Sequence, residues 1–179
     1  MFLIVCGFSI MSKKILVTGG TRSGKSVVAE KLTLQLTNKP VYISTAKIFD
    51  SEMALRVSKH QIRRNGIWKE YEAYTDLVEI IKKTDQFGPR LVDCLTLWLN
   101  NLIFEKKDWK LEVYKLVDCL AEQKQPIILV TNEVGSGILP ENKLARDFSD
   151  IVGETNSIIS KHTDTVYFVV SGISIKIKG

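Results

Sequence analysis

The stretch Gly19-Gly-Thr-Arg-Ser-Gly-Lys-Ser26 matches the pattern G-x-x-x-x-G-K-[ST] and decides the fold of this chain. Glycines are needed in such a loop because successive backbone N–H groups turn inward around phosphate oxygens, where side chains would clash. The apolar run of residues 15–17 precedes the loop and a helical pattern follows it, which is the strand–loop–helix context that the motif requires. The sequence therefore predicts a binding site for a nucleoside triphosphate.

Every residue of this loop is a candidate ligand of the nucleotide: Gly19, Gly20, Thr21, Arg22, Ser23, Gly24, Lys25 and Ser26. We expect Lys25 to reach the outer phosphates as a catalytic cation and Ser26 to offer a hydroxyl to Mg²⁺. The N-terminus of the following helix adds partial positive charge.

Short apolar runs alternate with helical patterns along the whole chain. We expect strands near residues 14–18, 40–44, 90–94, 126–131 and 165–170, and helices near 25–36, 51–64, 75–83, 95–105, 108–123 and 141–160. Strands that are apolar on both faces and separated by helices are typical of a parallel sheet covered on both sides. The predicted fold class is α/β, P-loop NTPase-like, with a mostly parallel sheet and helices on both faces. Residues 13–179 are expected to form a single nucleotide-binding catalytic domain.

Composition limits the classes of partner. The chain has 179 residues and a formal net charge of +5, but its lysines and arginines are scattered and do not interleave with aromatic residues. We therefore expect no nucleic-acid partner and attribute the positive charge to phosphate-bearing substrates. The three cysteines, Cys6, Cys94 and Cys119, form no metal-ligand or C-x-x-C spacing, so reduced thiols in a cytoplasmic protein are expected.

The first residues are apolar but lack the features of a targeting or membrane segment. The apolar residues 1–10 are too few to span a bilayer, which takes about 20, and no basic residue precedes them. We interpret residues 1–12 as an N-terminal extension, with Met11 as the real or an alternative start, and expect no membrane span.

Polar residues follow several of the predicted strands. Asp93 ends the run Arg90-Leu-Val and resembles the Walker B acid that holds Mg²⁺ beside a phosphate loop. The alternative interpretation is a carboxylate that caps the next helix. With the phosphate loop present we favour the metal role, so Ser26 and Asp93 are the candidate Mg²⁺ ligands.

The predicted helix at 51–64 places Arg56, His60, Arg63 and Arg64 on one side, because residues three and four apart share a helix face. Arginines suit phosphate oxygens, and a neutral imidazole can attack phosphorus. From the residues alone, a solvated basic face is the better interpretation of this cluster.

A resemblance changes that interpretation. From Lys14 to Lys178 the chain resembles the bifunctional adenosylcobinamide kinase / adenosylcobinamide-phosphate guanylyltransferase family of cobalamin biosynthesis. The phosphate loop is shared by many folds, whereas the stretch Val130–Arg146 and the ending Val169-Val-Ser-Gly-Ile173 are far more restrictive. The chain departs from the family pattern at Ala46, Lys59 and Asn65.

The resemblance implies two reactions: phosphorylation of adenosylcobinamide by ATP or GTP, then transfer of GMP from GTP to adenosylcobinamide phosphate. The second reaction is implied to pass through a GMP-histidine intermediate at His60. Further nucleotide-binding positions implied by the family are Thr45, Ala46, Lys47, Arg63, Arg64, Glu72 and Asp93. A homotrimer is implied as well.

The sequence leaves two alternative functions open. One is a different small-molecule P-loop kinase in which His60 is structural and no guanylyl transfer occurs. The other is a nucleotide switch, which the lack of a complete guanine-reading N-K-x-D pattern disfavours: residues 38–41 read Asn-Lys-Pro-Val, without the acid.

Overall fold

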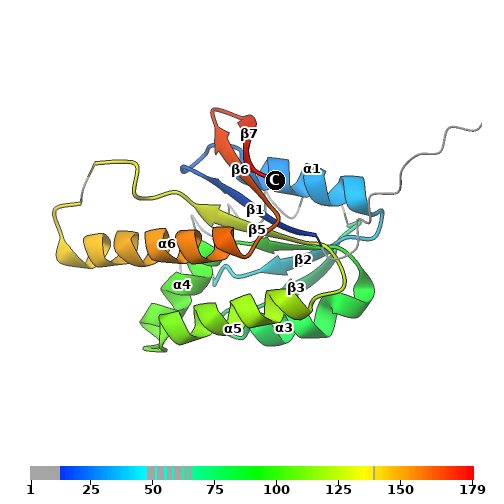
Figure 1. The fold of residues 1–179 in the computed structure, drawn as a ribbon, viewed down its shortest axis with the longest axis horizontal. Helices are drawn as coiled ribbons and strands as arrows, with labels where there is room; N and C mark the ends of the chain where they lie inside the picture. The colour runs from blue at the N-terminus through cyan, green and yellow to red at the C-terminus, as the bar shows by residue number, and fades with distance from the viewer. Residues whose placement is uncertain are drawn as a thin grey trace, which may run out of the picture.

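The computed structural model of the chain describes residues 13–47, 51, 55, 58, 62, 64, 66–138 and 140–179. Strands from this part of the chain form one seven-stranded sheet in the order β3-β2-β4-β5-β1-β6-β7 (Figure 1). They are β1 (Lys14–Gly19), β2 (Val41–Ser44), β3 (Lys69–Glu72), β4 (Arg90–Asp93), β5 (Ile127–Asn132), β6 (Thr165–Val170) and β7 (Ile173–Lys178). Strands β1 to β6 pair in parallel, and only β7 runs antiparallel to its neighbour.

The helices occupy the intervals between strands, as the sequence predicts. They are α1 (Lys25–Leu36), α3 (Leu77–Thr84), the short 3-10 helix η1 (Asp85–Phe87), α4 (Leu95–Phe104), α5 (Trp109–Glu122) and α6 (Lys143–Lys161). Of the predicted helix at 51–64, the five described residues are helical. No helix among the described residues is long and apolar enough to cross a membrane.

Alternate residues of each strand feed two hydrophobic layers. In β1, Ile15 and Val17 face the layer that α1 completes, while Leu16 faces the layer built with α3, α4, α5 and α6. Figure 1 shows α1 on one side of the sheet and α3, α5 and α6 on the other. The predicted α/β class, with a mostly parallel sheet and helices on both faces, is confirmed.

Two edge strands were not expected from the sequence. Strand β3 reads Lys-Glu-Tyr-Glu and β7 alternates isoleucine with serine and lysine. Both lie at the ends of the sheet, where one side has no neighbouring strand and side chains remain exposed. Their composition therefore lacks the continuous apolar run by which buried strands are recognised.

Arg90, the first residue of β4, binds groups of α3, of η1 and of the C-terminal end of α5 at the amino edge of the sheet. Its side chain is fully buried, and one guanidinium nitrogen lies 2.8 Å from Asp85. The other donates to Gln123 Oε1 at 2.6 Å and to the Ile81 carbonyl at 3.0 Å. Burial lowers the pKa of Arg90 and the carboxylate of Asp85 opposes that shift. A buried charge with this many partners is costly to break.

We expect Arg90→Met to lower the free energy of unfolding by about 3 kcal/mol, because Asp85 and Gln123 lose their partner. Urea denaturation followed by circular dichroism measures the change. Lys115→Met is the control, because its ion pair with Glu112 is exposed and worth less than about 1 kcal/mol. Equal effects of the two substitutions would contradict the role given to Arg90.

Candidate active site

The loop between β1 and α1 has the shape of a phosphate cradle. The Ser23 N–H donates to the Gly20 carbonyl at 3.2 Å, and Gly24 adopts a left-handed φ of 95° immediately before α1. Lys25 folds back over the loop, with Nζ donating to the Gly20 carbonyl at 3.3 Å. Its ammonium group thus lies over the loop at the N-terminus of α1, where phosphate oxygens are favoured.

The β6–β7 turn packs directly against this loop. The Gly172 N–H donates to the Ser23 carbonyl at 2.8 Å, and a Cβ on Gly24 would lie 3.3 Å from Gly172 Cα. A Cβ on Gly19 would lie 2.3 Å from the Val169 carbonyl oxygen. The restrictive ending at residues 169–173 therefore has a physical role, since it supports the loop from behind.

Two hydroxyl groups beside the loop are buried without a hydrogen-bond partner in the described part of the chain. They are Ser23 Oγ and Thr18 Oγ1. Buried polar atoms are nearly always paired in folded proteins, so unpaired ones need an explanation. A phosphate-bearing ligand in the loop would supply acceptor oxygens.

Asp93 lies at the carboxyl end of β4, separated from β1 by β5. Its Oδ2 accepts a hydrogen bond of 3.1 Å from the hydroxyl of Tyr42. Burial, and then the negative charge of Asp93, raises the pKa of Tyr42 far above its ordinary value, so the hydroxyl stays protonated and donates. Within the described residues, Oδ1 of Asp93 accepts no hydrogen bond.

These groups fit a magnesium ion. Ser26 and Asp93 offer a hydroxyl and a carboxylate, and oxygen is the ligand type that Mg²⁺ prefers. No cluster of three or more acidic, histidine or cysteine side chains exists among the described residues. In nucleotide sites Mg²⁺ is typically held by one or two protein groups, and phosphate oxygens and water complete the coordination.

Thr45 and Cys94 join the ends of β2 and β4. The buried Thr45 hydroxyl donates to the Cys94 carbonyl at 2.7 Å and accepts from the Cys94 N–H at 2.8 Å. The Asn101 side chain donates to the Thr45 carbonyl at 2.9 Å. These bonds fix Thr45 and Ala46 beside Asp93, while Lys47 lies 3.7 Å from Glu105.

Cys94 is a free and buried thiol. Burial first, and the charge of Asp93 second, raises its pKa to about 12, while the charge of Lys25 opposes the shift. The thiol is therefore neutral at physiological pH and is no nucleophile.

The loop after β5 completes this edge of the sheet. The Glu133 N–H donates to the Gly19 carbonyl at 2.9 Å, and the Glu133 carboxylate accepts from the Gly135 N–H at 2.9 Å. The ends of four parallel strands therefore bring the phosphate loop, Thr45–Lys47, Asp93 and Glu133 to one edge of the sheet.

Of the remaining predicted residues, Glu72 ends β3 in register with Ser44 and Asp93 at the same sheet edge, and Arg64 lies against Tyr42 of β2. Arg64 is buried, with its guanidinium carbon 3.7 Å from the centre of the Tyr42 ring and Nε 2.8 Å from Glu70. Glu72, exposed at the end of β3, accepts a 2.6 Å hydrogen bond from the Tyr74 hydroxyl. His60 and Arg63 lie outside the described residues, so their positions stay predictions.

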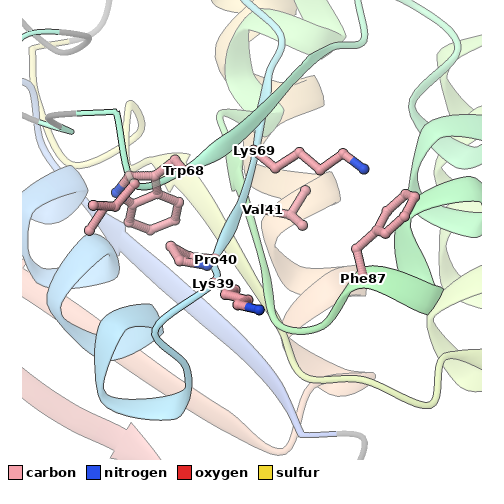
Figure 2. Close-up of a pocket in the computed structure, with 7 residues that line it drawn as sticks. Lys39, Pro40, Val41, Trp68, Lys69 and Phe87 are labelled. Atoms are coloured by element: carbon pink, nitrogen blue, oxygen red, sulfur yellow. The ribbon is translucent and has the colours of Figure 1, made fainter.

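A hollow of about 380 Å³ lies at the opposite edge of the sheet, near the amino ends of β2 and β3 (Figure 2). Lys39, Pro40 and Trp68 line it, and the side chain of Lys69 extends toward Phe87. Since the phosphate loop follows the carboxyl end of β1, this hollow is separate from the candidate active site.

We expect Gly19→Ala to destabilise the nucleotide-free protein by about 2–4 kcal/mol, because the new Cβ collides with the Val169 carbonyl. Gly20→Ala is the matched control, since a Cβ there meets nothing within 4 Å. Thermal unfolding without nucleotide measures both. If the two variants have the same melting temperature, the packing of β6 against the loop does not constrain Gly19.

The comparisons with known proteins agree with this geometry. The family model described as cobinamide kinase / cobinamide phosphate guanyltransferase matches residues 15–177. The chain is 38% identical to the bifunctional adenosylcobalamin biosynthesis protein CobU of Salmonella typhimurium, over 92% of this chain and 99% of the relative. It is 37% identical to the bifunctional adenosylcobalamin biosynthesis protein CobP of Pseudomonas aeruginosa, over 92% and 96%.

Among solved structures, the chain is similar to the flagellar accessory protein FlaH from Methanocaldococcus jannaschii. The TM-score is 0.50 at 15% sequence identity, and the match covers 94% of this chain and 79% of that one. This likeness concerns the fold alone. The family match over nearly the whole chain, together with relatives of 37–38% identity, identifies the chain as a member of the cobinamide kinase / cobinamide phosphate guanyltransferase family.

Proposed function

We propose that the phosphate loop of this bifunctional kinase and guanylyltransferase holds the nucleotide triphosphate in both reactions, with Mg²⁺ held by Ser26 and Asp93. The observation that carries the proposal is the loop itself, with Lys25 folded over it and Asp93 at the same sheet edge. The unpaired hydroxyl of Ser23 supports it, because a phosphate would give that buried group a partner. We expect the enzyme to act in the cytoplasm.

In the kinase reaction, the hydroxyl of the aminopropanol arm of adenosylcobinamide attacks the γ-phosphorus of ATP or GTP. A new P–O bond forms as the hydroxyl loses its proton to water, the bond to the β-phosphate oxygen breaks, and the nucleoside diphosphate leaves with the electron pair. Lys25 and the loop N–H groups stabilise the charge that develops on the leaving oxygen. When bound, Mg²⁺ supplies further charge neutralisation there.

In the guanylyl transfer, a ring nitrogen of His60 attacks the α-phosphorus of GTP, and pyrophosphate leaves as the P–N bond forms. An oxygen of adenosylcobinamide phosphate then attacks the same phosphorus. The P–N bond breaks, the imidazole recovers its electron pair, and adenosylcobinamide-GDP is formed. Splitting the transfer into two displacements is the general advantage of a covalent intermediate.

The other nucleotide contacts of the proposal follow the family pattern. They are assigned to Thr45, Ala46, Lys47, Arg63, Arg64 and Glu72. For Thr45, Ala46 and Lys47 the position beside Asp93 supports the assignment. For Arg64 the burial against the Tyr42 ring indicates a second role, in addition to a nucleotide contact.

We expect GTP labelled at the α-phosphate to leave label on the wild-type protein after denaturation, stable to alkali and released by acid, as a phosphoramidate is. His60→Ala should abolish this label, because it removes the attacking nitrogen. His162→Ala is the control, since His162 is exposed and its ring is engaged with the Ile158 carbonyl at 2.9 Å. Label that persists in His60→Ala would place the nucleophile elsewhere. If the wild-type protein retains no label, the covalent intermediate is ruled out.

We also propose that the chain forms a homotrimer. The edge strand β7 supports self-association, because Ile173, Ile175 and Ile177 are 50–65% exposed on it. Exposed rows of apolar side chains are commonly covered in assemblies. Light scattering after size-exclusion chromatography should give three times the 20.2 kDa of one chain; a monomer mass would rule the trimer out.

A further inference from the structure

Tyr42 connects the candidate magnesium acid to the interior of the protein. It lies in the middle of β2, is 5% exposed, and donates its hydroxyl to Asp93 Oδ2 at 3.1 Å. A buried tyrosine hydroxyl usually finds a partner, and the backbone of a sheet offers many. Here the partner is the one carboxylate that the nucleotide site is expected to need.

The Tyr42 ring is held on two sides. The guanidinium carbon of Arg64 lies 3.7 Å from the ring centre, and the ring of Trp68 meets it edge-on at 5.9 Å and 88°. Arg64 is in turn paired with Glu70 through Nε at 2.8 Å. These contacts restrict both the tilt and the depth of the phenol, so they also fix where its hydroxyl lies.

The environment of Arg64 indicates that this stacking is more than incidental. Its side chain is 3% exposed, and Nη1 has no hydrogen-bond partner in the described part of the chain. Burying a guanidinium with an unpaired nitrogen costs free energy, and the face of an aromatic ring offsets part of that cost. Arg64 and Tyr42 therefore stabilise each other's position.

The hydrogen bond from Tyr42 also makes the two oxygens of the Asp93 carboxylate inequivalent. Oδ2 is engaged by Tyr42, whereas Oδ1 accepts no bond from the described residues. A carboxylate with one oxygen fixed presents the other in a defined orientation. Groups that orient a metal-binding carboxylate in this way typically change metal affinity 10–100-fold when removed.

We propose that Tyr42 is a positioning residue for Asp93: its hydroxyl orients the carboxylate for the magnesium–nucleotide complex, and Arg64 and Trp68 hold its ring in place. The proposal rests on the assignment of Asp93 as the magnesium acid. Arg64 then acts through Tyr42, besides any contact it makes with a phosphate.

The test compares Tyr42→Phe with Tyr71→Phe. The first keeps the ring beneath Arg64 and removes only the hydroxyl. The second removes a hydroxyl from the adjacent strand β3, where the Tyr71 ring stacks on Phe87 and its hydroxyl makes no hydrogen bond to a described residue. Mn²⁺ serves as the probe, and its binding to the protein with a non-hydrolysable GTP analogue is measured by electron paramagnetic resonance.

Tyr42→Phe should weaken Mn²⁺ binding about tenfold, and Tyr71→Phe should leave it within about twofold of wild type. Affinity for the analogue without metal should not change in either variant. In turnover, Tyr42→Phe should raise the Mg²⁺ concentration needed for half-maximal rate, with the rate recovering at high Mg²⁺. Mn²⁺ binding by Tyr42→Phe equal to that of Tyr71→Phe overturns the proposal.

Asp93→Asn, measured in parallel, distinguishes the proposed role of Tyr42 from the assignment of Asp93 as the magnesium acid, on which that role rests. If Asp93→Asn binds Mn²⁺ like the wild type, the assignment of Asp93 fails, and the role of Tyr42 fails with it. If Asp93→Asn weakens binding while Tyr42→Phe does not, only the role of Tyr42 fails. Adding Tyr42→Phe to Asp93→Asn should weaken binding no further, because the hydroxyl acts through that carboxylate.

The melting temperature of the metal-free protein checks for a purely structural role. Tyr42→Phe retains the stacked ring, and water can replace the hydroxyl at the partly exposed Asp93, so it should melt close to wild type. Tyr42→Leu should melt well below, because Arg64 loses the ring that it stacks on. A fall for Tyr42→Phe as large as that for Tyr42→Leu means that the hydroxyl holds the fold, which overturns the proposal.

Discussion

Six strands of the sheet pair in parallel, and the functional edge of the protein exists because of that pairing. Parallel strands place all their carboxyl ends at one edge, so the loops after β1, β2, β4 and β5 meet there. The phosphate loop after β1 and Asp93 at the end of β4 are held in register by β5, which pairs with both strands. Since the two hydrophobic layers fill opposite faces of the sheet, this edge is left for polar side chains.

The positions of the polar groups at this edge are fixed by contacts with neighbouring strands and turns. The β6–β7 turn supports the phosphate loop through Gly172, the Thr45–Cys94 bonds join the ends of β2 and β4, and Tyr42 holds Asp93. Such preorganisation matters in phosphoryl transfer, where most of the catalysis is positioning and electrostatic stabilisation. Very little of the arrangement depends on exposed ion pairs, which solvent and salt weaken.

The family assignment decides between functions that the phosphate loop leaves open. A simple small-molecule kinase and a nucleotide switch would both contain the same loop, the same sheet and an acid after β4. The match of the cobinamide kinase / cobinamide phosphate guanyltransferase model over residues 15–177 selects the bifunctional enzyme. The likeness to FlaH concerns the fold alone and does not bear on this choice.

The sequence by itself determined the α/β class, the phosphate-loop motif and five strands of the sheet, with Asp93 at the end of one of them. Each of these is a local pattern of apolar residues or a motif of eight neighbouring residues. The sequence did not reveal the edge strands β3 and β7, whose exposed side chains carry no apolar run. Nor did it reveal Tyr42, which lies 51 residues from Asp93 and reads as an ordinary strand residue. Only the tertiary structure decided which buried side chain the acid would meet and which turn would support the loop, because those contacts depend on which strands become neighbours in the sheet.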